Sequence, residues 1–101
     1  MNLSLEDWKN QLENDENAII LDVRTPEEFQ NGYIPGAYNI DIYQGQGFIY
    51  NIEALDKTKN YYVYCQAGMR SAKACEIMNS LDIKNTYNLS GGIMNWPGEI
   101  I

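Results

Sequence analysis

Two short, continuously apolar runs constrain the fold of this chain more than any other feature. They are AIILDV at 18–23 and YYVYC at 61–65. Apolar runs of this length without alternation are typical of strands that are buried on both faces. Such strands occur where helices cover the two sides of a parallel sheet. The runs therefore indicate an α/β fold.

The segments around these runs carry the signals of helices. Ser4 and Asp7 resemble a capping box and predict a helix over 5–14, while TPEE at 25–28 predicts a short helix that ends at Gly32. Further elements are predicted as a strand over 37–42, a helix around 49–55, a helix over 71–81, a strand over 86–89 and a helical turn over 93–96. Strands that alternate with helices predict one domain over residues 1–101, with a central, mostly parallel sheet of about five strands and helices on both faces.

Composition narrows the chemistry that is open to this fold. The chain of 101 residues has no histidine, two cysteines and a formal net charge of −7. Without histidine, Ser-His-Asp and Cys-His catalysis and imidazole metal ligands are excluded, and two cysteines are too few for a thiolate-only zinc site. The acidic excess argues against nucleic acid and anionic membranes as partners. The catalytic options that remain are Cys, carboxylate, Lys and Tyr.

Two further patterns bear on where the protein works. No apolar stretch approaches the roughly 18 residues that a membrane span requires. The N-terminal sequence lacks the basic-then-apolar order of a signal peptide. We therefore expect a cytoplasmic protein.

Polar chemistry follows both buried runs. Asp22 comes at the end of the first strand and Cys65 at the end of the later one. Because the carboxyl ends of parallel strands meet at one edge of a sheet, where ligands bind, we expect these residues on the same edge. For Asp22 and Arg24 a structural role is favoured, in which the carboxylate pairs with the guanidinium or binds loop amides.

The segment after Cys65 has the features of a loop that activates a thiol. The predicted loop consists of Gln66, Ala67, Gly68 and Met69. Its backbone N–H groups and the N-terminus of the following helix both favour a thiolate over a thiol. Gly68 suits a positive φ, and its missing side chain is expected to leave room above the sulfur. We therefore predict Cys65 as a nucleophile rather than an inert core residue.

Three side chains after the loop complete the predicted site. Arg70 is expected to strengthen the thiolate, and either binds an anionic donor or braces the loop. Ser71 is interpreted first as a helix cap. Cys75 lies within the predicted helix and is expected to pack inertly rather than to act as a resolving thiol.

Four motifs follow one another along the chain: LDVR with EEF at 21–29, GYIPGAYNI at 32–40, CQAGMRS at 65–71, and LSGG at 89–92 with Trp96. In this order they resemble the first signature, the second signature, the active-site loop and the C-terminal signature of rhodanese domains. The matches span about 18–97. Tyr33 stands where the second signature usually carries His, a position that is not the nucleophile.

The resemblance implies a sulfurtransferase. Cys65 would attack the sulfane sulfur of a donor, become a persulfide, and pass the sulfur to a thiol or cyanide acceptor, while the loop amides from Gln66 to Arg70 cradle it. No metal or organic cofactor is needed. Since Gln66, Ala67 and Met69 carry no charge, a persulfide donor, small or protein-borne, is at least as well suited as thiosulfate.

Two other functions stay open. A rhodanese-like module could bind a partner protein or sense oxidants through Cys65 without catalysis. Folds of this kind also include cysteine phosphatases and arsenate reductases, and the phosphatases place five residues between Cys and Arg. Here four residues separate Cys65 from Arg70, so the smaller cradle favours one sulfur atom over a tetrahedral oxyanion.

Overall fold

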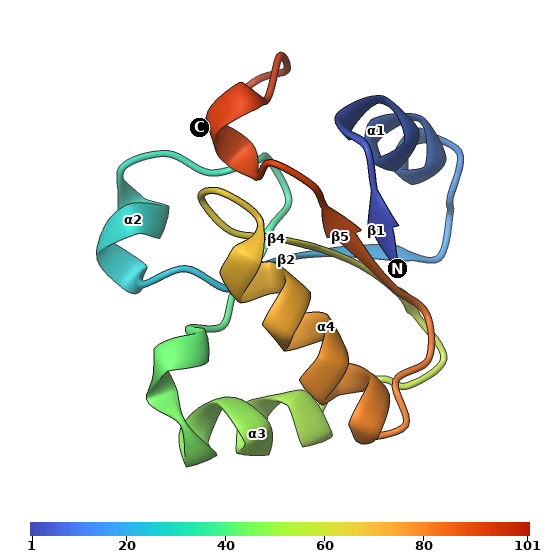
Figure 1. The fold of residues 1–101 in the computed structure, drawn as a ribbon, viewed down its shortest axis with the longest axis vertical. Helices are drawn as coiled ribbons and strands as arrows, with labels where there is room; N and C mark the ends of the chain where they lie inside the picture. The colour runs from blue at the N-terminus through green and yellow to red at the C-terminus, as the bar shows by residue number, and fades with distance from the viewer.

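A five-stranded parallel sheet forms the centre of the molecule (Figure 1), and the computed structural model describes all 101 residues. The strands are β1 (Asn2–Leu3), β2 (Ala18–Asp22), β3 (Tyr38–Asn39), β4 (Asn60–Tyr64) and β5 (Thr86–Leu89). They lie in the order β1-β5-β4-β2-β3, and every neighbouring pair is parallel. The predicted α/β architecture is confirmed.

Helices cover both faces of this sheet. The α-helices are α1 (Leu5–Glu13), α2 (Pro26–Gln30), α3 (Gln46–Glu53) and α4 (Met69–Ser80), and two short 3-10 helices are η1 (Ile42–Gln44) and η2 (Ile93–Asn95). In Figure 1, α3 and α4 lie below the sheet, whereas α1 and the segment around η2 lie above it. No helix has the length and the apolar character needed to cross a lipid bilayer.

The alternation of side chains along β4 explains its continuous apolar sequence. Tyr61 and Val63 face a core formed with α3 and α4. Tyr62 and Tyr64 face a second core on the other side of the sheet, together with Trp8 from α1. All four of these residues are fully buried, whereas Asn60 at the start of the strand is partly exposed. The strand is therefore apolar from Tyr61 to Tyr64 because both of its faces are covered there.

The predicted starts of the first two helices, α1 and α2, are confirmed. The Ser4 hydroxyl accepts a hydrogen bond from the Asp7 amide at 3.1 Å. Thr25 and Glu28 form a complete capping box at the start of α2. Both caps satisfy backbone N–H groups that the first turn of a helix leaves without partners.

Some boundaries differ from the predicted ones. The strand predicted over 37–42 contains only β3, because the chain then turns into η1, where Asp41 accepts a hydrogen bond from the amide of Tyr43. The sequence pattern did not indicate β1, since its two residues are too few to show a periodicity. It is held at the sheet edge by the register of Leu3 with Leu89.

Candidate active site

The carboxyl ends of β2 and β4 bring the predicted site residues to one edge of the sheet. Asp22 is paired in register with Tyr64, the residue before Cys65. The strands are direct neighbours in the sheet. The expectation that Asp22 and Cys65 share an edge is therefore confirmed, and this edge is where a ligand crevice forms in parallel sheets.

Cys65 lies beneath its loop, with three hydrogen-bond donors directed at its sulfur. Sγ accepts hydrogen bonds from the amides of Gly68 at 3.1 Å and Ser71 at 3.4 Å. The Ser71 hydroxyl lies 3.3 Å from the same sulfur. The side chain of Cys65 is only 1% exposed. A sulfur held in this way is enclosed and surrounded by partial positive charge.

This environment favours the thiolate of Cys65. Burial raises the pKa of the thiol, but the hydrogen bonds from the hydroxyl and amide of Ser71 and from the amides of Gly68 and Ala67 lower it by more. The net result is a pKa below the ordinary value for cysteine. Since the thiolate is the nucleophilic form, the geometry supports the predicted reactivity of Cys65.

Ser71 differs from its predicted role. The N-cap of α4 is Gly68, which has φ 103°, and Ser71 lies within the first turn of the helix. The side chain is fully buried, and its hydroxyl lies 3.2 Å from the Gly68 carbonyl oxygen as well as close to Sγ. The interpretation of Ser71 as a helix cap is therefore wrong: the residue is a donor to the reactive sulfur.

The positive φ predicted for Gly68 is confirmed, but the space around it differs from the expectation. A Cβ at Gly68 would come 3.0 Å from the amide nitrogen of Gly91 and 3.4 Å from the carbonyl oxygen of Leu89. The missing side chain therefore makes room for the neighbouring backbone and not for a ligand above the sulfur. Glycine is needed here for close packing between the loop and the segment after β5.

That segment also holds the outer part of the loop. The amide of Ile93 donates to the carbonyl of Cys65 at 3.0 Å, and the amide of Met94 donates to the carbonyl of Gln66 at 3.4 Å. A Cβ at Gly92 would overlap the carbonyl group of Gln66. Sequence reasoning did not foresee these contacts. The only signal for them was the glycine pair that follows β5.

The guanidinium of Arg70 is paired with a carboxylate of another helix. Its guanidinium forms two hydrogen bonds with the carboxylate of Glu28, at 2.7 and 2.9 Å, and lies 5.4 Å from the centre of the Tyr43 ring. The guanidinium holds the pKa of Glu28 down at about 2. Of the two roles considered for Arg70, the structure shows bracing, between α4 and α2.

Asp22 and Arg24 form a buried ion pair at the base of the site. Their exposed fractions are 0% and 4%, and Nη2 of Arg24 lies 2.6 Å from Oδ2 of Asp22. The same guanidinium donates to the carbonyl of Gly32 at 2.8 Å and to the side chain of Gln66 at 3.3 Å. The pair therefore ties the end of β2 to the loop, which is the structural role expected for it.

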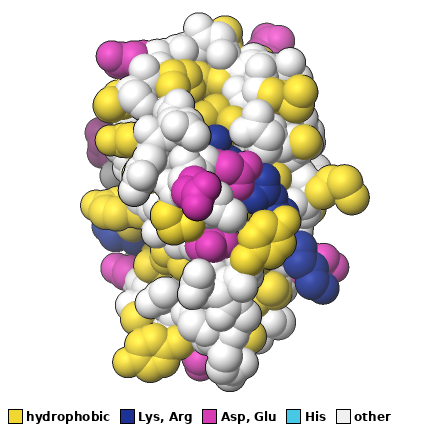
Figure 2. Space-filling model, turned by 90° about the vertical axis from the view of Figure 1, so that its left-hand side faces the viewer, with side chains coloured by type: hydrophobic (Ala, Val, Ile, Leu, Met, Phe, Trp, Pro, Cys, Tyr) yellow, Lys and Arg dark blue, Asp and Glu magenta, His cyan; other side chains and the backbone are white.

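A cavity of about 390 Å³ opens beside the loop. It is lined by Arg24, Glu28, Asn31, Gly32, Gln66, Ile93, Met94 and Ile100. Figure 2 shows this side of the molecule, where acidic and basic side chains lie together at the centre and hydrophobic side chains lie around them. No group of three or more Cys, Asp or Glu side chains is placed to hold a metal ion.

Two other residues that the sequence singled out lie away from the sulfur. Cys75 is buried in the core between the sheet and α4, as expected, and burial raises the pKa of its thiol. The Tyr33 ring stacks on Phe29 with centroids 4.0 Å apart. Its backbone exchanges two hydrogen bonds with Ile101, at 3.2 and 2.9 Å. Tyr33 thus packs in the wall next to α2.

Comparison with known proteins agrees with this geometry. A family model described as the rhodanese-like domain matches residues 4–99. The chain belongs to the rhodanese-like domain family. A rhodanese-like domain protein from Staphylococcus aureus has a similar structure, with a TM-score of 0.81 and 34% identity, covering 97% of this chain and 92% of that one.

Curated relatives of this rhodanese-like chain include proteins named as sulfurtransferases. The "Putative sulfurtransferase YtwF" of Bacillus subtilis (strain 168) is 39% identical over 94 residues, which cover 90% of this chain and 84% of that protein. Other relatives are longer. The tRNA uridine(34) hydroxylase of Pelagibacter ubique is 34% identical, and the matched part is 90% of this chain but 30% of that protein. Rhodanese-like domains thus occur alone and as parts of larger proteins.

Proposed function

We propose that this chain is a sulfurtransferase in which Cys65 carries the transferred sulfur. The observation that carries the proposal is the set of three donors, from Gly68 and Ser71, around a buried Sγ with a lowered pKa. The same donors that stabilise a thiolate would stabilise the outer sulfur of a persulfide, which also bears negative charge. Relatives named as sulfurtransferases support this assignment.

The first step loads the enzyme. The Cys65 thiolate attacks the outer sulfur of a donor R–S–SH, a new S–S bond forms, and the donor's own S–S bond breaks. The products are Cys65–S–SH and the thiolate R–S⁻, so the charge of −1 is conserved. Loss of the Cys65–S–SH proton to water then gives the persulfide anion that the loop donors stabilise. With thiosulfate as donor, the products are the Cys65 persulfide anion and sulfite. The reaction is covalent catalysis with the thiolate as nucleophile.

The second step restores the enzyme. A thiolate acceptor attacks the outer sulfur of the Cys65 persulfide and leaves with it, which returns the Cys65 thiolate. Cyanide in the same role gives thiocyanate. Because the sulfur arrives and leaves in separate steps, ping-pong kinetics are expected. Both steps use only this chain's residues, the donor and the acceptor.

The shape of the loop favours sulfur over a larger group. Four residues lie between Cys65 and Arg70, and Arg70 is paired with Glu28 rather than free to bind an oxyanion. A phosphatase or arsenate reductase needs positive charge and donors around a tetrahedral anion. Sulfur transfer fits this site better.

Intact mass spectrometry tests the proposal. Incubation with thiosulfate or glutathione persulfide is expected to add about 32 Da, one sulfur atom, to the wild-type protein. The Cys75→Ser variant should gain the same mass, and the Cys65→Ser variant should not. If no sulfane donor modifies Cys65, catalysis is rejected. The remaining function would then be that of a module that binds a partner protein or senses oxidants through Cys65.

A further inference from the structure

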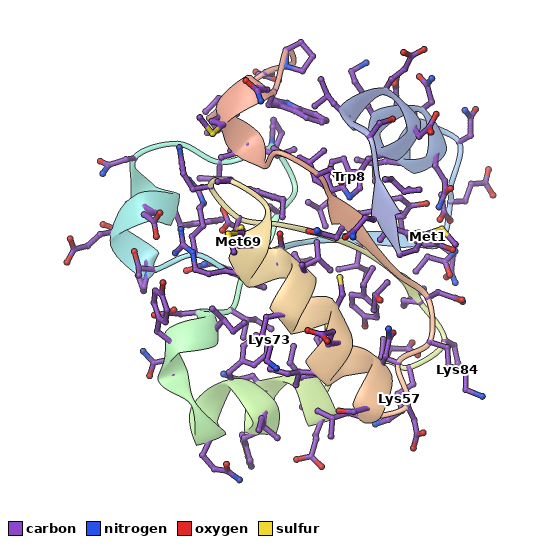
Figure 3. The ribbon with its side chains drawn as sticks, in the orientation of Figure 1. Met1, Trp8, Lys57, Met69, Lys73 and Lys84 are labelled. Atoms are coloured by element: carbon purple, nitrogen blue, oxygen red, sulfur yellow. The ribbon has the colours of Figure 1, made fainter.

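Exposed hydrophobic side chains gather around the mouth of the site. Eight large hydrophobic residues of the chain are exposed. Four of them surround the loop, and we call these the collar: Tyr43 (68% exposed), Met69 (83%), Met94 (63%) and Ile100 (44%). Figure 3 shows Met69 at the start of α4, beside the loop. Aromatic residues and Met are enriched in protein interfaces, so the collar resembles a docking surface.

Three collar residues are tied to the site by a contact or by the cavity, and the fourth, Met69, begins α4 directly after the loop. The Tyr43 ring lies against the guanidinium of Arg70. The amide of Met94 binds the carbonyl of Gln66, and Ile100 lines the cavity beside the same residue. The four side chains come from η1, α4, η2 and the residues after η2. A small anion such as thiosulfate would not reach across four separate segments.

The charges at the mouth indicate the chemistry of the partner. The ion pairs Asp22–Arg24 and Arg70–Glu28 neutralise both arginines. Glu27, next to Glu28 in α2, and Asp41, at the start of η1, form no ion pair with a basic residue, and neither does Lys73 on α4. The protein as a whole carries a net charge of −7. An acidic protein attracts a basic partner and repels an anionic one during encounter.

The depth of the sulfur adds a steric requirement. Cys65 is 1% exposed, so the broad surface of a folded protein would not reach Sγ. A cysteine persulfide projects its reactive sulfur one atom further than a thiol. An exposed, extended segment that bears such a persulfide can place the outer sulfur at the loop while its neighbouring residues contact the collar.

On the basis of the proposed function, we infer that the sulfur donor of this enzyme is a cysteine persulfide on a basic, partly apolar polypeptide segment that docks on the collar. The Cys65 thiolate takes the outer sulfur, the donor S–S bond breaks, and the peptide departs as a thiolate. The proton of the donor persulfide moves with the outer sulfur and is then released to water, which leaves the anionic Cys65 persulfide. No oxidant or reductant is consumed.

Two short peptides of equal length test this inference. Each carries a single cysteine persulfide, flanked by Lys and Leu in one peptide and by Glu and Ser in the other. Sulfur delivery is followed as thiocyanate formed with cyanide as acceptor, beside thiosulfate and glutathione persulfide as small donors. The kcat/KM of the basic peptide is expected to exceed that of the acidic one about tenfold at low salt, and the ratio should shrink at about 0.5 M salt.

Matched variants locate the docking surface. Tyr43→Ser is expected to lower the ratio of kcat/KM for the basic peptide to that for glutathione persulfide by about threefold. Tyr50→Ser removes an equally exposed tyrosine from α3 and should leave this ratio unchanged. Glu27→Lys should weaken the preference for the basic peptide, and Glu53→Lys at the end of α3 should not.

The outcomes separate the two proposals. If small donors load Cys65 but the two peptides react equally well, or if the Tyr50 and Tyr43 variants behave alike, the docking surface is wrong and the sulfurtransferase remains. If neither peptides nor small donors load Cys65, the proposed function itself is rejected. A preference for the acidic peptide would overturn the charge argument and with it the inference.

Discussion

Arg70 and Glu28 are joined by two hydrogen bonds, Nη1 to Oε1 at 2.7 Å and Nη2 to Oε2 at 2.9 Å. The same carboxylate accepts hydrogen bonds from the amide of Thr25 at 3.2 Å and from its hydroxyl at 3.1 Å. Glu28 therefore completes the capping box of α2 and also anchors the start of α4. A single carboxylate connects two elements that flank the active-site loop.

The pH dependence of the free energy of unfolding should reveal the contribution of the Glu28 carboxylate. The pKa of Glu28 is about 2 in the folded protein against an ordinary value of 4.5. Its contribution to the free energy of unfolding is therefore complete above pH 4.5 and is lost as the pH falls toward 2. Glu28→Gln is expected to be less stable than the wild type by about 1 kcal/mol at pH 7, and the difference should shrink below pH 4.5.

Urea denaturation at pH 7, 5 and 3 measures this difference. The exposed pair Lys9–Glu13 on α1 provides the control. Glu13→Gln should change the free energy of unfolding by no more than about 0.5 kcal/mol at pH 7. If the free energies of unfolding of the wild type and Glu28→Gln differ equally at pH 7 and pH 3, the ionised Glu28 carboxylate is not the source of the difference.

Removal of the Ser71 hydroxyl should raise the pKa of the Cys65 thiol. The hydroxyl lies 3.3 Å from Sγ, and in Ser71→Ala only backbone amides remain to stabilise the thiolate. The rate of alkylation by iodoacetamide, measured against pH, should show its midpoint shifted to higher pH. Sulfur transfer at pH 7 should fall about tenfold, since a hydrogen bond to a charged group contributes about 1.5–3 kcal/mol.

Two controls accompany the Ser71 measurement. Cys75→Ser should leave the alkylation midpoint unchanged, because Cys75 is buried in the core. Cys65→Ser should abolish the alkylation whose midpoint lies below that of an ordinary cysteine. An unchanged midpoint in Ser71→Ala would show that the amides alone determine the thiolate.

Gly92→Ala should disrupt the loop more than an ordinary glycine substitution does. Gly92 has φ 71°, and its Cβ would overlap the carbonyl of Gln66. Gly36 also has a positive φ, 88°, but no atom lies within 4 Å of its Cβ position. We expect Gly36→Ala to lower the free energy of unfolding by about 1 kcal/mol, and Gly92→Ala by about 3 kcal/mol with loss of most activity. Equal effects of the two substitutions would be inconsistent with the close approach.

Asp22→Asn should be strongly destabilising. The substitution keeps the size of the side chain but leaves the charge of Arg24 buried without its counter-ion. Breaking a buried pair in this way costs about 3–5 kcal/mol. In a double-mutant cycle with Arg24→Gln, the double variant should lose less stability than the sum of the two single variants. Additive losses would show that the two residues do not act as a pair.

The sequence predicted the elements whose signals are local. The buried runs indicated β2 and β4, because successive residues of a strand that is covered on both faces are apolar. The capping residues located the starts of α1 and α2. The edge that carries Asp22 and Cys65 followed from the general behaviour of parallel sheets.

The features that were missed depend on contacts between distant segments. Ser71 was interpreted as a cap because serine is common at that position, yet the helix begins at Met69, two residues earlier than predicted, with Gly68 as its N-cap. The partner of Arg70 could not be known, since Glu28 lies 42 positions away along the chain. The closure of the loop by Ile93 and Met94 depends on backbone amides, which leave no trace in side-chain patterns.

The closure of the loop has a consequence for the biosynthesis of the protein. The carbonyl groups of Cys65 and Gln66 are held by amides of Ile93 and Met94, which the ribosome adds only after α4 has been made. We therefore expect that a nascent chain extending no further than α4 carries Cys65 as an ordinary thiol. The reactive thiolate then forms only after β5 and η2 have emerged and docked, so that an incomplete chain is protected from premature oxidation and from mispairing with other thiols.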